Sequence, residues 1–258
     1  MISTGKVLKG LVPHTQSSAN AVFRGDVYLS SGEIRRAFIK DLDPRQLGNE
    51  LLVATLAKSL GVSVPDAALV IVEPDVSMAF KKIPHGKSGA FVAFCSMDAN
   101  GSTIAQILAA DPASDAIPRL KSSPLLGKIY GFDAWVANID RHRNNLILSG
   151  DGSFYLIDHG HCFTGPSWMA SDLNSSKEYI SKLKLWLTPN LNSSDKDRAM
   201  AEIKILTSGM VGTDVQLIIE ECLADKLYGA NDSDAVVGFL ESRVSHVLSL
   251  SAKALHTL

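Results

Sequence analysis

The sequence lacks an excess of charge of either sign, and it lacks a long apolar run. Its 25 Lys and Arg residues are balanced by 27 Asp and Glu residues, which gives a formal net charge of -2. A chain with this balance has no overall electrostatic attraction to a polyanion, so we expect no nucleic-acid partner. The longest apolar run, residues 67–72, is far too short to cross a bilayer. We therefore expect no transmembrane segment.

Cysteine is also scarce. Cys95, Cys162 and Cys222 are odd in number and far apart in the sequence, which fits neither a disulfide framework nor a zinc motif. Residues 1–6 lack the apolar core of a signal peptide. We expect reduced thiols and a cytoplasmic protein.

Two regions of different character follow one another along the chain. Residues 7–72 show mainly strand patterns, with a hairpin over 27–40 and a helix that we expect Asn49 to cap and that ends before Gly61. After about residue 100 the apolar residues recur at helical spacing, and a second hairpin over 146–157 interrupts them. We expect a two-lobed α+β fold with a strand-rich N-lobe over residues 1–97 and a helical C-lobe over residues 98–258.

Polar side chains that suit magnesium chemistry flank the second hairpin. Asn145 opens its first strand and Asp158 follows its second strand, so antiparallel pairing would bring both side chains to one end. An amide oxygen and a carboxylate are suitable ligands for Mg²⁺. Asp140 precedes Asn145 by the interval found in the catalytic loop of protein kinases, where the Asp accepts or orients the proton of an attacking hydroxyl.

Two residues of the strand-rich region complete this pattern. Lys40 ends the second strand of the first hairpin, and Glu50 follows in the expected first turn of the next helix. A lysine in this place would contact the phosphates of ATP, and a glutamate would hold it by an ion pair. Glu50 also has a simpler explanation, because a carboxylate in a first turn is favoured by the helix dipole.

The run from Asp133 to Asn145, with Asp140-Arg141-His142 at its centre, and the later segment 156–160 resemble the HipA-like kinases and, more distantly, the phosphoinositide lipid kinases. Longer HipA proteins carry an additional N-terminal subdomain, so the chain is similar to the compact members. The resemblance implies a protein-kinase-like fold that uses ATP and Mg²⁺. It implies that Asp140 is the catalytic aspartate, that His142 is a structural or phosphate-side residue of the catalytic loop, and that Asn145 and Asp158 are the magnesium ligands.

The same resemblance implies that Lys40 contacts ATP and that the phosphate acceptor is a serine or threonine of a protein. It further allows a regulatory partner similar to an antitoxin. The glycine-rich phosphate loop of kinases is missing, since residues 15–20 are rich in serine and have no glycine. Ser17 and Ser18 are therefore expected to contact the phosphates, or to be autophosphorylated and so to repel ATP.

Three other functions stay open from the sequence. A pseudokinase would bind the nucleotide without transfer, and a lipid or small-molecule kinase would use another hydroxyl acceptor. A metal-dependent hydrolase would use the imidazoles of His142, His159 and His161 together with Asp140 and Asp158. An amphipathic segment over 179–187 suits either a membrane or partner contact or, the interpretation that we favour, a core-packed helix with a solvated basic face.

Overall fold

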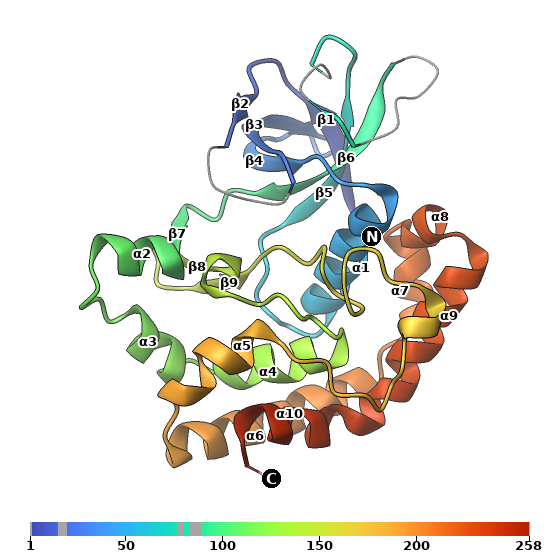
Figure 1. The fold of residues 1–258 in the computed structure, drawn as a ribbon. Coiled ribbons are helices and arrows are strands. Elements are labelled where there is room, and N and C mark those ends of the chain that lie inside the picture. Colours follow the sequence, from blue (N-terminus) through green and yellow to red (C-terminus); the bar gives the residue numbers. More distant parts are fainter. Residues whose placement is uncertain (1, 15–19, 77–79, 83–88, 258) are drawn as a thin grey trace.

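The computed structural model describes residues 2–14, 20–76, 80–82 and 89–257, and it has two parts with a waist between them (Figure 1). The first part is rich in strands and the second is rich in helices, which confirms the expected α+β class. No helix within the described residues has the length and apolar character that a membrane span requires. The last strand of the first part ends at Met97, and we keep the division after residue 97 as a proposal.

A small closed barrel forms the strand-rich part. Strand β1 pairs in parallel with β5 on one side and antiparallel with β3 on the other, and this double pairing closes the sheet β1-β5-β6-β4-β3 on itself. Inside it lies a separate apolar core. Strand β2 adds to the edge of β3. The strands are β1 (Ser3–Val7), β2 (Val12–Pro13), β3 (Val22–Leu29), β4 (Ile34–Lys40), β5 (Ala67–Val72) and β6 (Phe91–Met97).

The first predicted hairpin is present and it positions Lys40. Strands β3 and β4 pair from Tyr28 opposite Ile34 to Val22 opposite Lys40. The turn contains Gly32 at φ 91°, a backbone conformation that glycine adopts at low cost. Because side chains alternate along a strand, Ala37 and Ile39 enter the barrel core, while Phe38 and Lys40 point to its outer face.

The helix after this hairpin begins earlier than the sequence suggested. Helix α1 (Pro44–Ser59) is capped by Asp43, whose side chain accepts a hydrogen bond from the Gln46 backbone N–H (2.9 Å). Asp followed by Pro is a strong start signal, because Pro lacks the N–H that the first turn leaves unsatisfied. The predictions that Asn49 caps the helix and that Glu50 lies in its first turn are therefore wrong. Both residues are buried in the helix interior.

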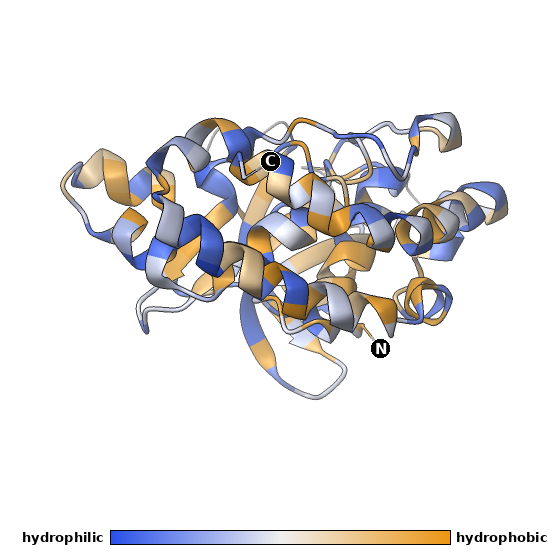
Figure 2. Ribbon diagram, turned by 90° about the horizontal axis from the view of Figure 1, so that it is seen from below, coloured by the Kyte–Doolittle hydropathy of each residue, from blue (hydrophilic) through white to orange (hydrophobic). Residues whose placement is uncertain are grey.

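The second part surrounds a small sheet with helices. Strands β7 (Gly101–Thr103), β8 (Leu146–Ser149) and β9 (Phe154–Leu156) form this sheet, and β8 and β9 are the second predicted hairpin. The helices are α2 (Ile104–Ala110), α3 (Ala116–Ser122), α4 (Leu125–Trp135), α5 (Lys182–Trp186), α6 (Ser193–Val211), α7 (Val215–Glu221), α8 (Ala224–Tyr228), α9 (Ala230–Arg243) and α10 (Val247–Leu255). Seen from the helical end, they carry both apolar and polar residues, as expected for helices that bury one side (Figure 2).

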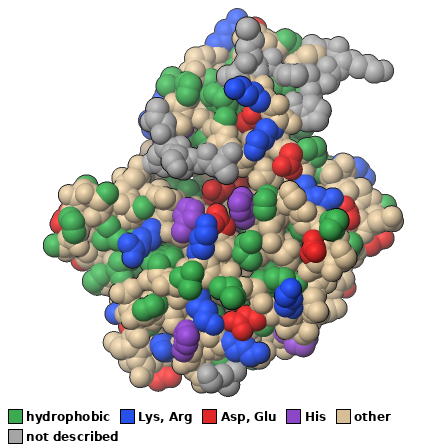
Figure 3. All heavy atoms as spheres, in the orientation of Figure 1, with side chains coloured by type: hydrophobic (Ala, Val, Ile, Leu, Met, Phe, Trp, Pro, Cys, Tyr) green, Lys and Arg blue, Asp and Glu red, His purple; other side chains and the backbone are tan. Residues whose placement is uncertain are grey.

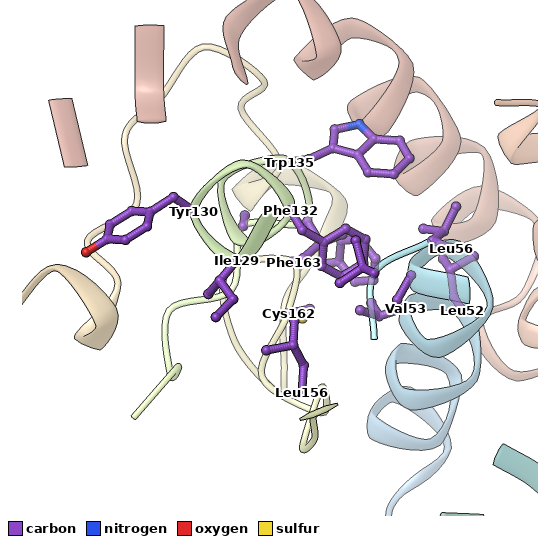
Figure 4. Packing of buried hydrophobic residues seen from close by; sticks show 14 of the residues in the cluster. Leu52, Val53, Leu56, Ile129, Tyr130, Phe132, Trp135, Leu156, Cys162 and Phe163 are labelled. Atoms are coloured by element: carbon purple, nitrogen blue, oxygen red, sulfur yellow. The ribbon is translucent and has the colours of Figure 1, made fainter. Parts of the chain in front are cut away.

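A second apolar core joins α1 to the helical part. Leu52 and Leu56 of α1 lie in one cluster with Phe132 and Trp135 of α4 and with Phe163 (Figure 4). Gly48 allows α1 to approach α8 closely, because a Cβ atom at Gly48 would lie only 2.4 Å from a ring carbon of Tyr228. Helix α1 is thus connected to the barrel in sequence but packed against the helical part.

The amphipathic segment expected over 179–187 is a shorter helix. Helix α5 covers only Lys182–Trp186, and Leu183 and the following Leu187 are buried while Ile180 and Leu185 are exposed. This arrangement agrees with the core-packed interpretation.

Candidate active site

A cleft of about 840 Å³ lies between the barrel and the helical part. Acidic, histidine and basic side chains gather at this waist (Figure 3). Phe94, Ser96, Met97 and Asp98 line the cleft. Its volume lies within the usual range of small-molecule sites.

Lys40 lies at the centre of the cleft and contacts two carboxylates. Its Nζ atom lies 2.5 Å from Oε1 of Glu50 and 3.2 Å from Oδ1 of Asp158. These contacts join three distant elements, because Lys40 ends β4, Glu50 lies in α1 and Asp158 follows β9. The side chains of Lys40 and Glu50 are 11% and 1% exposed, whereas that of Asp158 is 39% exposed.

The two carboxyl groups that share this cation have pKa values shifted in opposite directions. Burial by itself would lower the pKa of Lys40, but the charges of Asp158 and Glu50 outweigh it and raise that pKa. The Lys40 charge lowers the pKa of Asp158 to about 2. Burial raises the pKa of Glu50 against the pull of Lys40. Asp158, the more exposed carboxyl group, is therefore the one held most firmly in its ionised form.

Asn145 and Asp158 lie at the same end of the β8–β9 hairpin, as the antiparallel pairing predicted. The Ile157 backbone N–H donates to the Asn145 carbonyl (3.1 Å), which closes this end of the hairpin. The Asn145 side-chain Nδ2 donates to the backbone oxygen of Asp140 (3.0 Å), so that its amide oxygen is the atom that would serve a cation. Asp158 has φ 62°, an uncommon value for a residue with a side chain, and such strain gathers at functional sites.

These features fit a magnesium-bound nucleotide. An amide oxygen and an ionised carboxylate, at one end of a hairpin and beside a lysine, form a hard, oxygen-only donor set. Mg²⁺ needs few protein ligands, because phosphate oxygens and water complete its octahedron.

Arg141 stabilises the end of the β8–β9 hairpin. Its guanidinium is fully buried and makes a two-pronged contact with the Asp133 carboxylate, Nε to Oδ2 and Nη2 to Oδ1 at 3.0 Å each. Its Nη1 donates to the backbone oxygens of Asn145 (3.1 Å) and Ile157 (2.7 Å). Arg141 thus fixes the two chain segments that carry Asn145 and Asp158.

Asn49 fixes the segment after Asp158. Its Nδ2 donates to the Gly160 carbonyl (2.9 Å), and its Oδ1 accepts from Trp168 Nε1 (3.0 Å) and Tyr228 Oη (2.8 Å). Asn49 is 0% exposed, so each of these bonds replaces one to water that burial has removed. The sequence predicted a helix cap for Asn49 and not this role, since its partners are more than a hundred residues away.

Of the three histidines considered for a metal site, His142 and His161 approach Asp140, whereas His159 contacts Arg141 instead. His142 Nε2 and His161 Nδ1 lie 3.6 and 3.8 Å from Oδ2 of Asp140. His159 is buried, with Nδ1 3.4 Å from Arg141 Nη2, and burial holds its pKa well below the usual value. Throughout the described residues, no group of three or more His, Cys, Asp and Glu side chains is placed to hold a metal ion. The donor set of a histidine-rich hydrolase is not assembled in this part of the chain.

Two further residues bear on the site. Lys182 contacts Oδ1 of Asp140 through Nζ, a contact that the sequence did not predict because 42 positions separate the two. His142 accepts a hydrogen bond at Nδ1 from the Asn144 N–H (3.2 Å), and burial lowers its pKa. Ser17 and Ser18 lie outside the described residues.

Comparison with known families supports a kinase-type protein. A family model described as HipA-like kinase matches residues 35–183, more than half of the chain, and the chain belongs to this family. The fold is also similar to the crystal structure of the proinflammatory kinase CtkA from Helicobacter pylori. That similarity has a TM-score of 0.49 and 14% sequence identity, and covers 91% of this chain and 94% of that one. No curated protein matches the sequence.

Proposed function

We propose that the chain is an ATP- and Mg²⁺-dependent phosphotransferase that phosphorylates a serine or threonine of a protein. The observation that carries this proposal is the pair of contacts from Lys40 Nζ to Glu50 (2.5 Å) and to Asp158 (3.2 Å). This arrangement supports the proposal because kinase chemistry requires a phosphate-binding lysine close to the metal ligands, and Lys40 of the barrel contacts Asp158 at the end of the hairpin.

The proposed roles follow from the atoms that face the cleft. Lys40 would bind the phosphates of ATP, and Glu50 would hold its ammonium in place. Asn145 and Asp158 would hold Mg²⁺, which neutralises charge on the phosphates when it is bound. Ser17 and Ser18 remain proposed phosphate-side or autophosphorylated residues.

Asp140 would receive the acceptor hydroxyl. Its backbone N–H donates to Asn138 Oδ1 (2.9 Å) and its carbonyl accepts from Asn145, so the main chain on both sides of the carboxylate is fixed. A carboxylate held in this way can accept the hydroxyl proton and orient the oxygen toward phosphorus. His142 would keep the loop in shape around it.

A protein acceptor, a cytoplasmic location and a regulatory protein partner are proposals that follow from family membership. A lipid or a small alcohol as acceptor, or binding without transfer, would each give a different result in the following experiment.

The test measures phosphate transfer from γ-labelled ATP with Mg²⁺, by the protein alone and in a lysate treated to inactivate its own kinases. Wild type is expected to label itself or a lysate protein on serine or threonine. Asp140→Asn and Asp158→Asn are expected to lower the rate by at least about 100-fold. Asp151→Asn, a matched change in the exposed β8–β9 turn, is expected to leave the rate unchanged.

Saturable Mg-ATP binding without any transfer would replace the proposal with a pseudokinase. Label that appears only in the lipid or small-molecule fraction would replace the protein acceptor. Equal activity of wild type and Asp158→Asn would contradict the assigned magnesium site.

A further inference from the structure

Helix α5 is attached to the catalytic loop at both of its ends. The Lys182 backbone N–H donates to the Ile139 carbonyl (3.0 Å), and the Trp186 indole Nε1 donates to the Arg141 carbonyl (3.0 Å). Leu183 and Leu187 anchor the same segment in the core, at 2% and 0% exposure. The position of α5 relative to Asp140 is therefore set without help from the Lys182 side chain.

The Lys182 side chain nevertheless extends to the proposed catalytic carboxylate. Its Nζ contacts Oδ1 of Asp140, it lines the cleft, and it is 56% exposed. An ion pair with so much exposure contributes little to stability, since water screens it and the long side chain loses freedom. The contact therefore calls for an explanation other than holding the fold together.

Among the described residues that line the cleft, the other Lys and Arg side chains pair with different carboxylates. Lys40 is shared by Glu50 and Asp158, and the guanidinium of Arg24 lies 2.6 Å from Asp98 at the barrel side. Lys182 is the cation beside Asp140, at the place where the acceptor hydroxyl and the transferred phosphoryl group would meet. An unscreened carboxylate there would repel the phosphate, and negative charge grows on the phosphoryl oxygens during transfer.

We infer that Lys182 is a catalytic residue whose ammonium contacts the transferred phosphoryl group while it pairs with Asp140. This inference rests on the proposed phosphotransferase function. In the reaction, the acceptor oxygen forms a bond to the γ-phosphorus as the bond to the β,γ-bridging oxygen breaks and ADP leaves. The hydroxyl proton passes to Asp140 and then to water. Lys182 balances the charge on the phosphoryl oxygens throughout.

Lys184 provides a matched control in the same helix. Its Nζ pairs with Glu178 Oε1 (3.0 Å) rather than with Asp140. Lys182→Ala is expected to lower kcat by about 100-fold, the loss typical of removing one charge-stabilising donor. The KM for ATP should rise by no more than about 10-fold, because Lys40 and the metal site would still hold the nucleotide. Lys182→Arg should recover about 10-fold of the loss, since it restores the charge with a different shape.

Lys184→Ala is expected to retain kcat within about 2-fold, and circular dichroism should show the same fold for all variants. A kcat for Lys182→Ala within about 3-fold of wild type would overturn the inference. An increase in kcat would also overturn it, because the contact with Asp140 would then be inhibitory.

A binding measurement separates this inference from the proposed function. If wild type transfers no phosphate, the proposed function fails, and the phosphoryl contact of Lys182 is tested by titrating Mg-ATP and Mg-ADP. If Lys182 contacts the γ-phosphate, Lys182→Ala should lower the ratio of the dissociation constant for Mg-ADP to that for Mg-ATP by about 5- to 10-fold, as expected for the loss of one charge-assisted contact. The same preference in wild type and Lys182→Ala would refute the contact.

Discussion

Replacing Asp133 with Asn should destabilise the protein strongly, although Asp133 does not line the cleft. The substitution keeps the shape of the side chain and removes the charge that faces the Arg141 guanidinium. Both side chains are buried, at 3% and 0% exposure, and two bonds of 3.0 Å join them. Burial raises the pKa of Asp133 and the Arg141 charge opposes this rise, so the carboxylate depends on its partner.

The expected loss follows from the state of the guanidinium after the change. Arg141 keeps its charge and cannot reach water, and breaking a buried pair on one side costs about 3–5 kcal/mol. Its bonds to the carbonyls of Asn145 and Ile157 offset only a part of this cost, because neutral oxygens do not replace a counter-charge. A domain with a total stability of about 5–15 kcal/mol would lose a large fraction of it.

The measurement is urea unfolding followed by circular dichroism, which gives the free energy of unfolding of each variant. Asp26→Asn is the matched control, since Asp26 pairs with Arg36 at 2.6 Å while their side chains are 41% and 52% exposed. This control is expected to lose about 0–1 kcal/mol. If Asp133→Asn and Asp26→Asn lose equal amounts, burial does not determine the strength of the pair and the reasoning is refuted.

Two further predictions concern the contacts around the cleft. Asp158, with a pKa lowered to about 2 mainly by Lys40, contributes stability that is present above its ordinary pKa near 4 and is lost as the pH falls toward 2. Thermal unfolding should therefore show that the difference in melting temperature between wild type and Lys40→Met shrinks as the pH is lowered from 4.5 to 2. A difference that stays constant over this range would contradict the prediction. Asn49→Ala leaves Trp168 Nε1 and Tyr228 Oη without their acceptor, so urea unfolding should show a free energy of unfolding lower by about 2–4 kcal/mol. A decrease of less than about 1 kcal/mol would contradict this prediction.

Turn and strand patterns in the sequence predicted the positions of those site residues that lie at the ends of hairpins. The β3–β4 turn fixed where Lys40 ends its strand, and the β8–β9 pairing brought Asn145 and Asp158 to one end. The error at Asn49 came from weighing one capping residue without the stronger Asp43-Pro44 start just before it. The placement of Glu50 in a first turn failed for the same reason.

The remaining features depend on contacts between distant parts of the chain. The parallel pairing of β1 with β5 joins residues about 65 positions apart, and neither strand carries a local signal for it. The contact of Lys182 with Asp140 depends on how α5 docks, which is decided by the burial of Leu183 and by the Trp186 indole. Such contacts follow from packing and not from periodicity.

Because α1 is attached to the helical part, the Lys40–Glu50 contact depends on how the barrel and the helical part are placed relative to each other. Lys40 belongs to the barrel, whereas Glu50 lies on a helix fastened to the helical part through Asn49 and through the close approach of Gly48 to Tyr228. The two charges therefore stand on opposite sides of the waist. A rotation that widened the waist would pull Nζ away from Oε1, so that opening the molecule and releasing Lys40 from Glu50 would be a single movement.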